Sequence, residues 1–186
     1  MRRLSSFLLV ICLGFLLSAP VYSLTVGGVS IPDQYQIGKT TLVLNGAGSR
    51  RKFIFVRIYV GALYVEKKTH NPQEVLKQPI KVVRMHFTYS HIPANKIRNA
   101  FKEDLERISA NLLKTEAAKE FLNIFTFPVK EGDNVDLIFY HDTLIVMLNQ
   151  KKVGQVKSGK LVNAVLSIYI GKHPASESLK KALLGE

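Results

Sequence analysis

The spacing of apolar residues changes along the chain, and this change limits the fold more than any other feature of the sequence. Residues 80–90 (IKVVRMHFTYS) alternate between apolar and polar side chains, which is typical of a β-strand. From 94 to 113 the apolar residues recur every three or four positions, as they do on one face of an amphipathic helix. A second helix is predicted at 115–125, with Thr115 as its N-cap.

Strand patterns then return before the chain ends in two further helices. The segment 133–157 predicts two or three short antiparallel strands, with turns at 141–142 and 150–152. Helices are predicted at 158–171 and 176–185. Strands, a helical pair, strands and helices in this order indicate an α+β fold, with a largely antiparallel sheet and helices packed on one face.

The segment 45–68 (NGAGSRRKFIFVRIYVGALYVEKK) combines a glycine-rich start with a long aromatic and β-branched run. We expect the first glycines to form a tight corner. The run that follows is long for one strand, so we expect Gly61 to mark a bulge or bend within it.

Arg50 and Arg51 stand at the start of this apolar run, and Arg57 lies inside it. A guanidinium stays charged in a protein and presents a planar fork of donors. At the rim of an apolar cleft, its natural partner is a carboxylate or phosphate held by two hydrogen bonds. The alternative is structural: the arginines pair with acids such as Asp136 or Glu66, and the aromatic run only fills a core.

The first residues, 1–23, have the three parts of a secretory signal peptide: a basic start, a short apolar block and a small-residue exit. The apolar block is shorter than the roughly 20 residues of a membrane span, although a membrane anchor is the alternative. We therefore expect one domain at 24–186, exported across the inner membrane to the periplasm. The only cysteine, Cys12, would leave with the signal peptide, which excludes disulfides and thiol catalysis in the mature chain.

The chain is basic, with a formal net charge of +12, and removal of the two arginines of the signal peptide leaves +10. Such a charge favours anionic partners, among them phospholipid headgroups and small carboxylates. Export argues against nucleic acid. Because the lysines are scattered (EKK, QKK, LKK), the charge also fits an ordinary solvated surface, or a basic module in transient contact with an anionic membrane surface.

Two parts of the sequence resemble chalcone isomerases and their fatty-acid-binding relatives. At 46–66 (GAGSRRKFIFVRIYVGALYVE) a glycine corner and an arginine precede a Phe-rich strand and a Tyr-aliphatic-Glu motif. At 162–185 (VNAVLSIYIGKHPASESLKKALLG) the order is helix, Ile-Gly, turn and short Leu-Lys helix. The resemblance extends over 26–184 and is strongest to the exported bacterial branch. It implies an open-faced β-sandwich, in which a curved antiparallel sheet and a helical layer enclose an apolar cleft.

The resemblance also implies site residues. In the plant isomerases the glycine-corner arginine stabilises negative charge during flavanone ring closure, whereas the fatty-acid binders use this arginine and a tyrosine to hold a carboxylate. The arginine falls on Arg50, with Arg51 as the alternative because the loop here is shorter. The position of the first isomerase threonine falls on Tyr59, with Tyr64 as the alternative.

The other isomerase positions are not matched. The family's tyrosine and asparagine would come from the segment before and within the helix at 94–113, where this chain has Asn95 or Lys96 and then Glu103. The final threonine falls on Ile168, with Ser167 adjacent. We therefore assign no catalytic residue. The candidate ligand-binding residues are Arg50, Tyr59, Arg51, Tyr64 and Ser167.

These observations favour a protein without catalytic activity that binds a fatty acid or a similar amphipathic carboxylate. An isomerase or lyase acting on an unsaturated, chalcone-like ketone is the first alternative, and a basic interaction module is the second. The five histidines are dispersed without metal-ligand spacing, so neither a metal nor another cofactor is expected. His86 and Tyr89 could supply an acid–base group within a cleft, although such a pair more often divides between core and surface. No oligomeric state follows from the sequence.

Overall fold

The computed structural model describes residues 23–52 and 56–186. The strands are β1 (Ser23–Val26), β2 (Val29–Pro32), β3 (Gln34–Ile37), β4 (Thr40–Lys52), β5 (Val56–Val65), β6 (Ile80–Phe87), β7 (His91–Ile92), β8 (Val129–Lys130), β9 (Asn134–Tyr140), β10 (Thr143–Leu148) and β11 (Lys151–Lys157). The helices are α1 (Pro72–Lys77), α2 (Ala94–Ile108), the 3-10 turn η1 (Leu112–Lys114), α3 (Glu116–Ile124), α4 (Gly159–Ile170) and α5 (Glu177–Leu183). The predicted signal peptide lies outside the described residues, except for Ser23.

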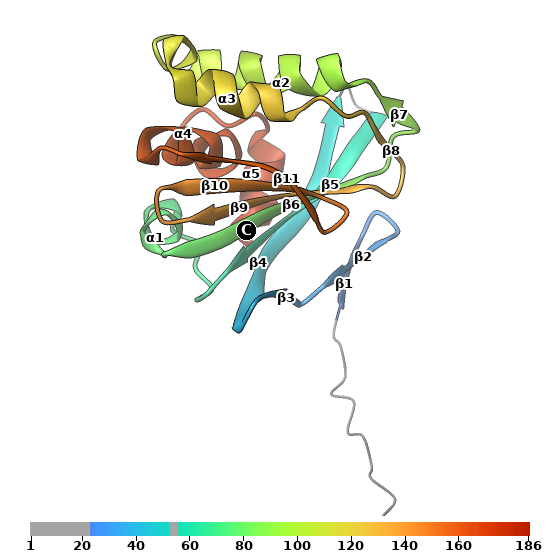
Figure 1. The fold of residues 1–186 in the computed structure, drawn as a ribbon. Coiled ribbons are helices and arrows are strands. Elements are labelled where there is room, and N and C mark those ends of the chain that lie inside the picture. The colour runs from blue at the N-terminus through green and yellow to red at the C-terminus, as the bar shows by residue number, and fades with distance from the viewer. Residues whose placement is uncertain (1–22, 53–55) are drawn as a thin grey trace, which may run out of the picture.

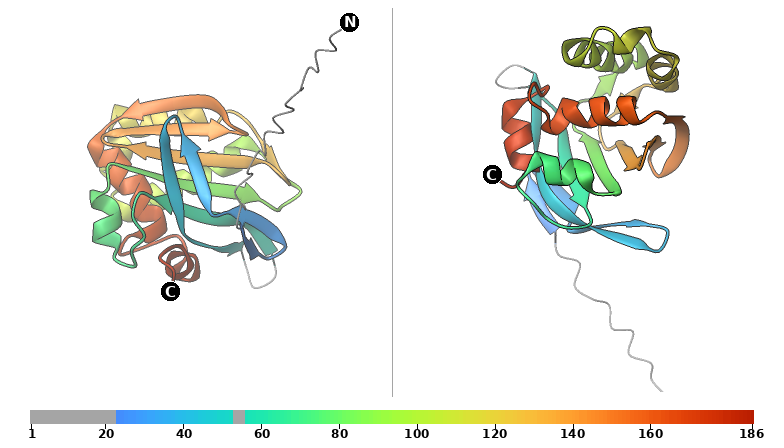
Figure 2. Two further views of the ribbon diagram at one scale, coloured as in Figure 1. Left: turned by 90° about the horizontal axis from the view of Figure 1, so that it is seen from below. Right: turned by 90° about the vertical axis from the view of Figure 1, so that its left-hand side faces the viewer.

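Seven of these strands form one antiparallel sheet in the order β11-β10-β9-β6-β5-β4-β3. The sheet is curved, and α2, α3, α4 and α5 lie on one side of it (Figures 1 and 2). The β1–β2 hairpin lies on the other side (Figure 1). This arrangement confirms the predicted α+β fold. We call the helix-covered side the inner face and the opposite side the outer face.

Each face of the sheet has its own hydrophobic core. The inner core is the larger and joins the sheet to α2, α3, α4 and α5, with Phe101, Phe121 and Phe125 forming an aromatic cluster at ring-centroid distances of 4.6–5.2 Å. The outer core is smaller and is closed by Ile31 of β2 over Val60 and Val82 of the sheet. Because both faces are covered at β5, this strand is almost continuously apolar, which explains the composition of the segment 56–65.

The predicted cap at Thr115 is present, and two further helices are capped in the same way. The side chains of Asn71, Thr115 and Ser158 accept hydrogen bonds from the first turns of α1, α3 and α4. The helix predicted at 94–113 is shorter in the structure. α2 ends at Ile108, and a 3-10 turn, η1, follows it.

The hairpin turns also follow the prediction closely. β9 and β10 are joined at His141, which has a φ of 50°. The second turn uses Asn149 and Gln150, one residue earlier than expected, with φ values of 48° and 69°.

The glycines at the start of the apolar run do not form a corner, so that prediction is wrong. Gly46 and Gly48 lie within the continuous strand β4, and α5 packs directly on them. A Cβ atom at Gly46 would lie 2.1 Å from the carbonyl oxygen of Ala182, and one at Gly48 would lie 2.5 Å from the Cβ of Ala182. Gly61 stands opposite Gly48 and faces Leu179. The glycines are therefore required by the close approach of a helix.

The β4–β5 ladder has two irregularities, and neither is at Gly61 as predicted. The first is at Asn45, whose side chain bonds to the backbone of Thr69 and to the carbonyl oxygen of Leu183 at 2.8–3.0 Å. The second is at Ile58, an extra residue on β5 between Arg57 and Tyr59. A bulge places two neighbouring side chains on one face and reverses the alternation beyond it.

Candidate functional site

Arg50 and Tyr59 lie directly opposite each other on β4 and β5. Gly46, Gly48 and Arg50 alternate onto the same face of β4, and the two glycines contact α5. Tyr59 packs against the inner core, and its ring lies 5.6 Å from that of Phe87. Both candidate residues therefore belong to the inner face, under the helices, and both are half-buried.

Two residues that sequence reasoning did not select complete this cluster. Tyr169 of α4 and Asp104 of α2 both interact electrostatically with Arg50 and Tyr59. The hydroxyl of Tyr169 lies 3.3 Å from the sulfur of Met85. We call Arg50, Tyr59, Tyr169 and Asp104 the inner cluster.

The helical spacing from buried residues could have identified both of the missed residues. Asp104 follows the inward-facing Phe101 by three positions, whereas its neighbour Glu103 is exposed. Tyr169 follows the buried Val165 by four positions. The family resemblance instead directed attention to the positions immediately before each of them.

Burial shifts the pKa values of the inner cluster. It raises the pKa of Tyr59 above its ordinary value, and the charge of Arg50 opposes this only in part. Burial raises the pKa of Tyr169 in the same way. It also raises the pKa of Asp104, against the stabilising contacts of Arg107 and Arg50. Both phenols are therefore protonated at neutral pH and able to donate a hydrogen bond.

The guanidinium of Arg50 makes no side-chain hydrogen bond and no ion pair within 4 Å to another described residue. Asp104 is instead bound to Arg107 at 2.5 Å. The inner cluster thus holds a half-buried positive charge whose donors are free to bind an added oxyanion.

The other predicted residues lie elsewhere. Arg51 is exposed and stands opposite Arg57, beyond the bulge. The hydroxyl of Ser167 donates to the carbonyl oxygen of Asn163 in its own helix at 2.7 Å. Ile168 is buried in the inner core. The structure therefore brings together Arg50 and Tyr59 but not Arg51 or Ser167.

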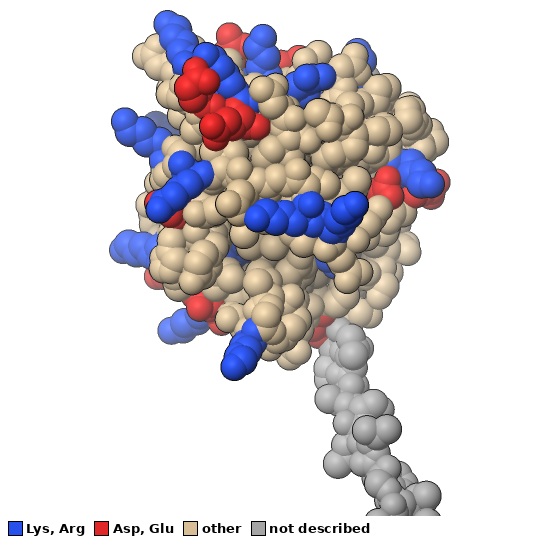
Figure 3. Space-filling view, in the orientation of Figure 1, with Lys and Arg blue, Asp and Glu red and all other residues tan. Residues whose placement is uncertain are grey.

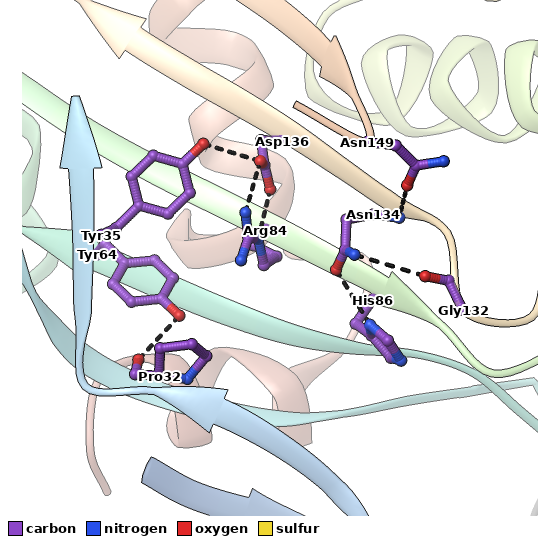
Figure 4. Close-up of polar contacts among 9 residues, drawn as sticks. All are labelled: Pro32, Tyr35, Tyr64, Arg84, His86, Gly132, Asn134, Asp136 and Asn149. Atoms are coloured by element: carbon purple, nitrogen blue, oxygen red, sulfur yellow. Dashed lines mark hydrogen bonds and ion pairs between the residues drawn. The ribbon is translucent and has the colours of Figure 1, made fainter. Parts of the chain in front are cut away.

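Tyr64 belongs to a second polar cluster, on the outer face (Figure 4). Its hydroxyl donates to the carbonyl oxygen of Pro32 at 3.0 Å. Beside it, Arg84 binds both carboxylate oxygens of Asp136 at 2.7 and 2.9 Å, and Tyr35 donates to the same carboxylate at 2.8 Å. The guanidinium carbon of Arg84 also lies 4.9 Å from the ring centroid of Tyr35. We call Tyr35, Tyr64, Arg84 and Asp136 the outer cluster.

The outer cluster shows which arginine pairs with Asp136, the acid that the structural alternative assigned to the arginines of segment 45–68. This carboxylate is fully buried, and the arginine that pairs with it is Arg84, not Arg50, Arg51 or Arg57. Farther along the same face, His86 contacts the amide oxygen of Asn134 at 3.0 Å (Figure 4).

The described part of the chain contains no group of three His, Cys, Asp or Glu residues that could hold a metal ion. Within the same residues, no helix is long and apolar enough to cross a membrane. Lysines and arginines are spread over the face seen in Figure 3, with acidic residues among them.

Two surface hollows lie away from the inner cluster. The larger, of about 500 Å³, lies at the β1–β2 turn, and the smaller, of about 200 Å³, lies beside Lys67 and α1. Neither is lined by Arg50 or Tyr59. Behind the inner cluster, the space between sheet and helices is occupied by the side chains of the inner core.

Comparisons with known proteins agree with the fold. A family model described as chalcone isomerase-like matches residues 23–185. Among solved structures, the fold is similar to a fatty-acid binding protein of Arabidopsis thaliana, with a TM-score of 0.69 and 21% sequence identity, over 84% of this chain and 92% of that one. A search of curated proteins finds no match.

Proposed function

Because the chain belongs to the chalcone isomerase-like family, we propose that it binds a fatty acid or a similar amphipathic carboxylate without catalysing a reaction. The similar fold of a plant fatty-acid binding protein supports this proposal. In it, Arg50 and Tyr59 hold the carboxylate of the ligand, and the acyl chain lies in the inner core.

The observation that carries the proposal is the half-buried guanidinium of Arg50, which lies opposite Tyr59 and has no ion pair among the described residues. Its permanent charge and planar donors match a carboxylate, and the protonated phenol of Tyr59 adds a further donor. Hydrogen bonds to a charged group contribute about 1.5–3 kcal/mol each. Such a site selects the class of ligand.

Most of the affinity comes from the acyl chain. Burial of apolar surface contributes about 0.8 kcal/mol per methylene, so a chain of about ten methylenes outweighs the headgroup. The aromatic rings of Phe101, Phe121 and Phe125 are packed together in this space, so the chain enters as α2 and α3 separate from the sheet. No side chain caps the start of α2, so one stabilising contact that is common at helix starts is missing there.

The proposal places the protein outside the inner membrane, in the periplasm. This location rests on the signal-peptide pattern of residues 1–23, nearly all of which lie outside the described residues.

The experiment is native mass spectrometry of the protein purified from its own cell envelope, together with melting temperatures measured with added fatty acids. We expect acyl ligands on the natural protein and on Lys102→Gln, a control that removes an exposed charge of α2. Arg50→Gln should lose them, and its affinity for added fatty acid should fall by about tenfold to a hundredfold.

Two results would count against the proposal. One is a natural protein that carries no lipid and is not stabilised by any added fatty acid. The other is turnover of an unsaturated ketone that disappears with Arg50→Gln, which would assign the same arginine to an isomerase.

A further inference from the structure

The larger surface hollow lies on the outer face, on the side of the sheet opposite to the inner cluster. Its walls come from the β1–β2 turn, the start of β5, the segment after β6 and the loop before β9. Its volume of about 500 Å³ is within the range of small-molecule sites, about 300–1,000 Å³.

The bulge at Ile58 explains why an arginine points into this hollow. Ile58 and Tyr59 both pack against the inner core, so the alternation of β5 is reversed at Arg57. Arg57 accordingly reaches the outer face, where its guanidinium donates to the carbonyl oxygen of Gly27. Glycine at position 27 permits this close contact, because a Cβ atom there would overlap the guanidinium and displace it.

Two buried side-chain polar atoms, on residues that line this hollow, have no hydrogen-bond partner. They are Nε of Arg57 and Oγ1 of Thr88, and they are the two buried side-chain polar atoms without a hydrogen bond among residues 23–52 and 56–186. Both residues line the same hollow. Buried polar atoms are nearly always hydrogen-bonded in proteins, so two such atoms in one hollow indicate a missing ligand.

The charge of the hollow indicates what kind of ligand is missing. Arg57 has no carboxylate within 4 Å among the described residues, and Glu131 lines the same hollow without pairing with it. A guanidinium only donates and is positively charged, and a hydroxyl is also able to donate, so a ligand that accepts several hydrogen bonds and carries negative charge satisfies both.

The rest of the wall is partly apolar. Val56 and Tyr89 line the hollow and are 36% and 42% exposed. From these contacts we propose a second binding site, which takes a phosphate ester: the phosphate accepts from Arg57 and Thr88, and the organic part of the molecule lies on Val56 and Tyr89. The phosphate belongs either to a soluble ester or to a lipid headgroup, and the two sources share this chemistry.

This site is independent of the proposed fatty-acid site. The two lie on opposite faces of the sheet, and β5 supplies Tyr59 to one and Arg57 to the other. A substitution in one site is therefore expected to leave the ligand of the other unchanged.

The experiment measures binding to the full chain by ³¹P NMR line broadening and by melting temperature. The probes are inorganic phosphate, glycerol phosphate, dihexanoyl phosphatidylglycerol below its micelle concentration, and vesicles of phosphatidylglycerol or phosphatidylcholine. Thr88→Val replaces the hydroxyl with a methyl group of the same shape, and Arg57→Gln removes the charge. We expect Arg57→Gln to weaken binding by about tenfold or more and Thr88→Val by about fivefold, with fatty-acid binding unchanged.

The results separate the two sources of phosphate. Binding of glycerol phosphate that is tighter than that of inorganic phosphate, with no binding of vesicles, supports the site with a soluble ester. Binding of the short-chain lipid and the phosphatidylglycerol vesicles alone supports it with a headgroup. In either case Arg57→Lys, which keeps the charge but lacks the fork of donors, should restore part of the affinity.

Three results would overturn the proposal. In the first, no probe binds the natural protein. In the second, vesicles bind equally well to the double variant Arg57→Gln, Thr88→Val, which would assign the binding to the general basic surface. In the third, Thr88→Val raises the melting temperature and leaves phosphate affinity unchanged, as expected of a hydroxyl that is simply unpaired.

Discussion

The two faces of the sheet each hold an arginine among tyrosines, and the two arginines are in opposite situations. On the outer face, Arg84 binds both oxygens of the fully buried Asp136, which also accepts from Tyr35. On the inner face, Arg50 stands opposite Tyr59 with no ion pair to any described residue.

The difference shows that residue type alone does not distinguish a structural site from a binding site. A guanidinium that is removed from water needs an acceptor, and Asp136 supplies one to Arg84 within the fold. Arg50 has no such acceptor among the described residues, and the carboxylate of the proposed ligand would supply one. The outer cluster should therefore determine stability, and the inner cluster should determine affinity.

The largest effect is expected from Asp136→Ala. Removal of one partner of a buried ion pair leaves the other charge unpaired and costs about 3–5 kcal/mol, so the free energy of unfolding should fall by about 3 kcal/mol, since Arg84 is partly exposed. Urea unfolding followed by circular dichroism measures this change.

The control is the double variant Arg84→Met, Asp136→Leu, which replaces the pair with apolar residues and should recover most of the lost stability. If Asp136→Ala is as stable as the natural protein, the outer cluster is not a structural site and the comparison fails.

The next effect is a loss of stability in alkali. Burial raises the pKa of Tyr64 to about 12, from an ordinary value of 10.0. A group whose pKa is raised by folding stabilises the protein fully below its unfolded pKa, and this contribution is lost as the pH rises toward the folded pKa. The free energy of unfolding should therefore fall between about pH 10 and pH 12.

Unfolding by urea at successive pH values tests this expectation. The fall should be shallower in Tyr64→Phe, which has no phenol to ionise at this position. An unchanged slope in that variant would mean that Tyr64 does not contribute.

Replacing Tyr64 on the outer face and Tyr59 on the inner face tests the difference between the two faces directly. Tyr64→Phe removes a hydrogen bond to the carbonyl oxygen of Pro32 and should cost about 1 kcal/mol of stability, with no change in fatty-acid affinity. Tyr59→Phe should do the reverse: stability within about 0.5 kcal/mol of the natural protein, and affinity lower by about fivefold. Thermal unfolding and titration calorimetry measure the two quantities. If both variants change the same quantity, the division between the faces is wrong.

The smallest effect is expected from Asp104→Asn. The carboxylate of Asp104 lies near Arg50 and would repel an incoming fatty-acid carboxylate, so its removal should tighten binding by about twofold to threefold. Because burial raises the pKa of Asp104, its ionisation also costs stability as the pH rises through that pKa, and the asparagine variant avoids this cost. The control is Glu103→Gln, which removes an exposed charge one position earlier and should leave affinity unchanged.

The spacing of apolar residues was sufficient to predict the order of strands and helices from residue 80 onward, and the residue type at position 115 predicted the cap of α3. These features depend on contacts between residues close together in the chain. The family resemblance added the sheet curvature and the pairing of Arg50 with Tyr59, which no local pattern contains.

The features that were missed depend on contacts between distant segments. Asp104 and Tyr169 come near Arg50 only after α2 and α4 pack on the sheet. The angle at which each helix packs cannot be predicted from the sequence of that helix alone. The bulge at Ile58, which sends Arg57 to the outer face, is likewise set by the pairing of β4 with β5. Strict alternation of side chains along β5 would place Arg57 on the same face as Tyr59.

The close packing of α5 on β4 limits which mutations the protein tolerates. Replacement of glycine by alanine inside a strand is ordinarily mild or beneficial, because glycine loses the most backbone freedom on folding. At Gly46 the sign reverses, since the methyl group would meet the backbone of Ala182 at 2.1 Å and neither strand nor helix has a flexible side chain there to yield. In a saturation library this position should therefore accept nothing larger than hydrogen, although it lies outside both proposed ligand sites.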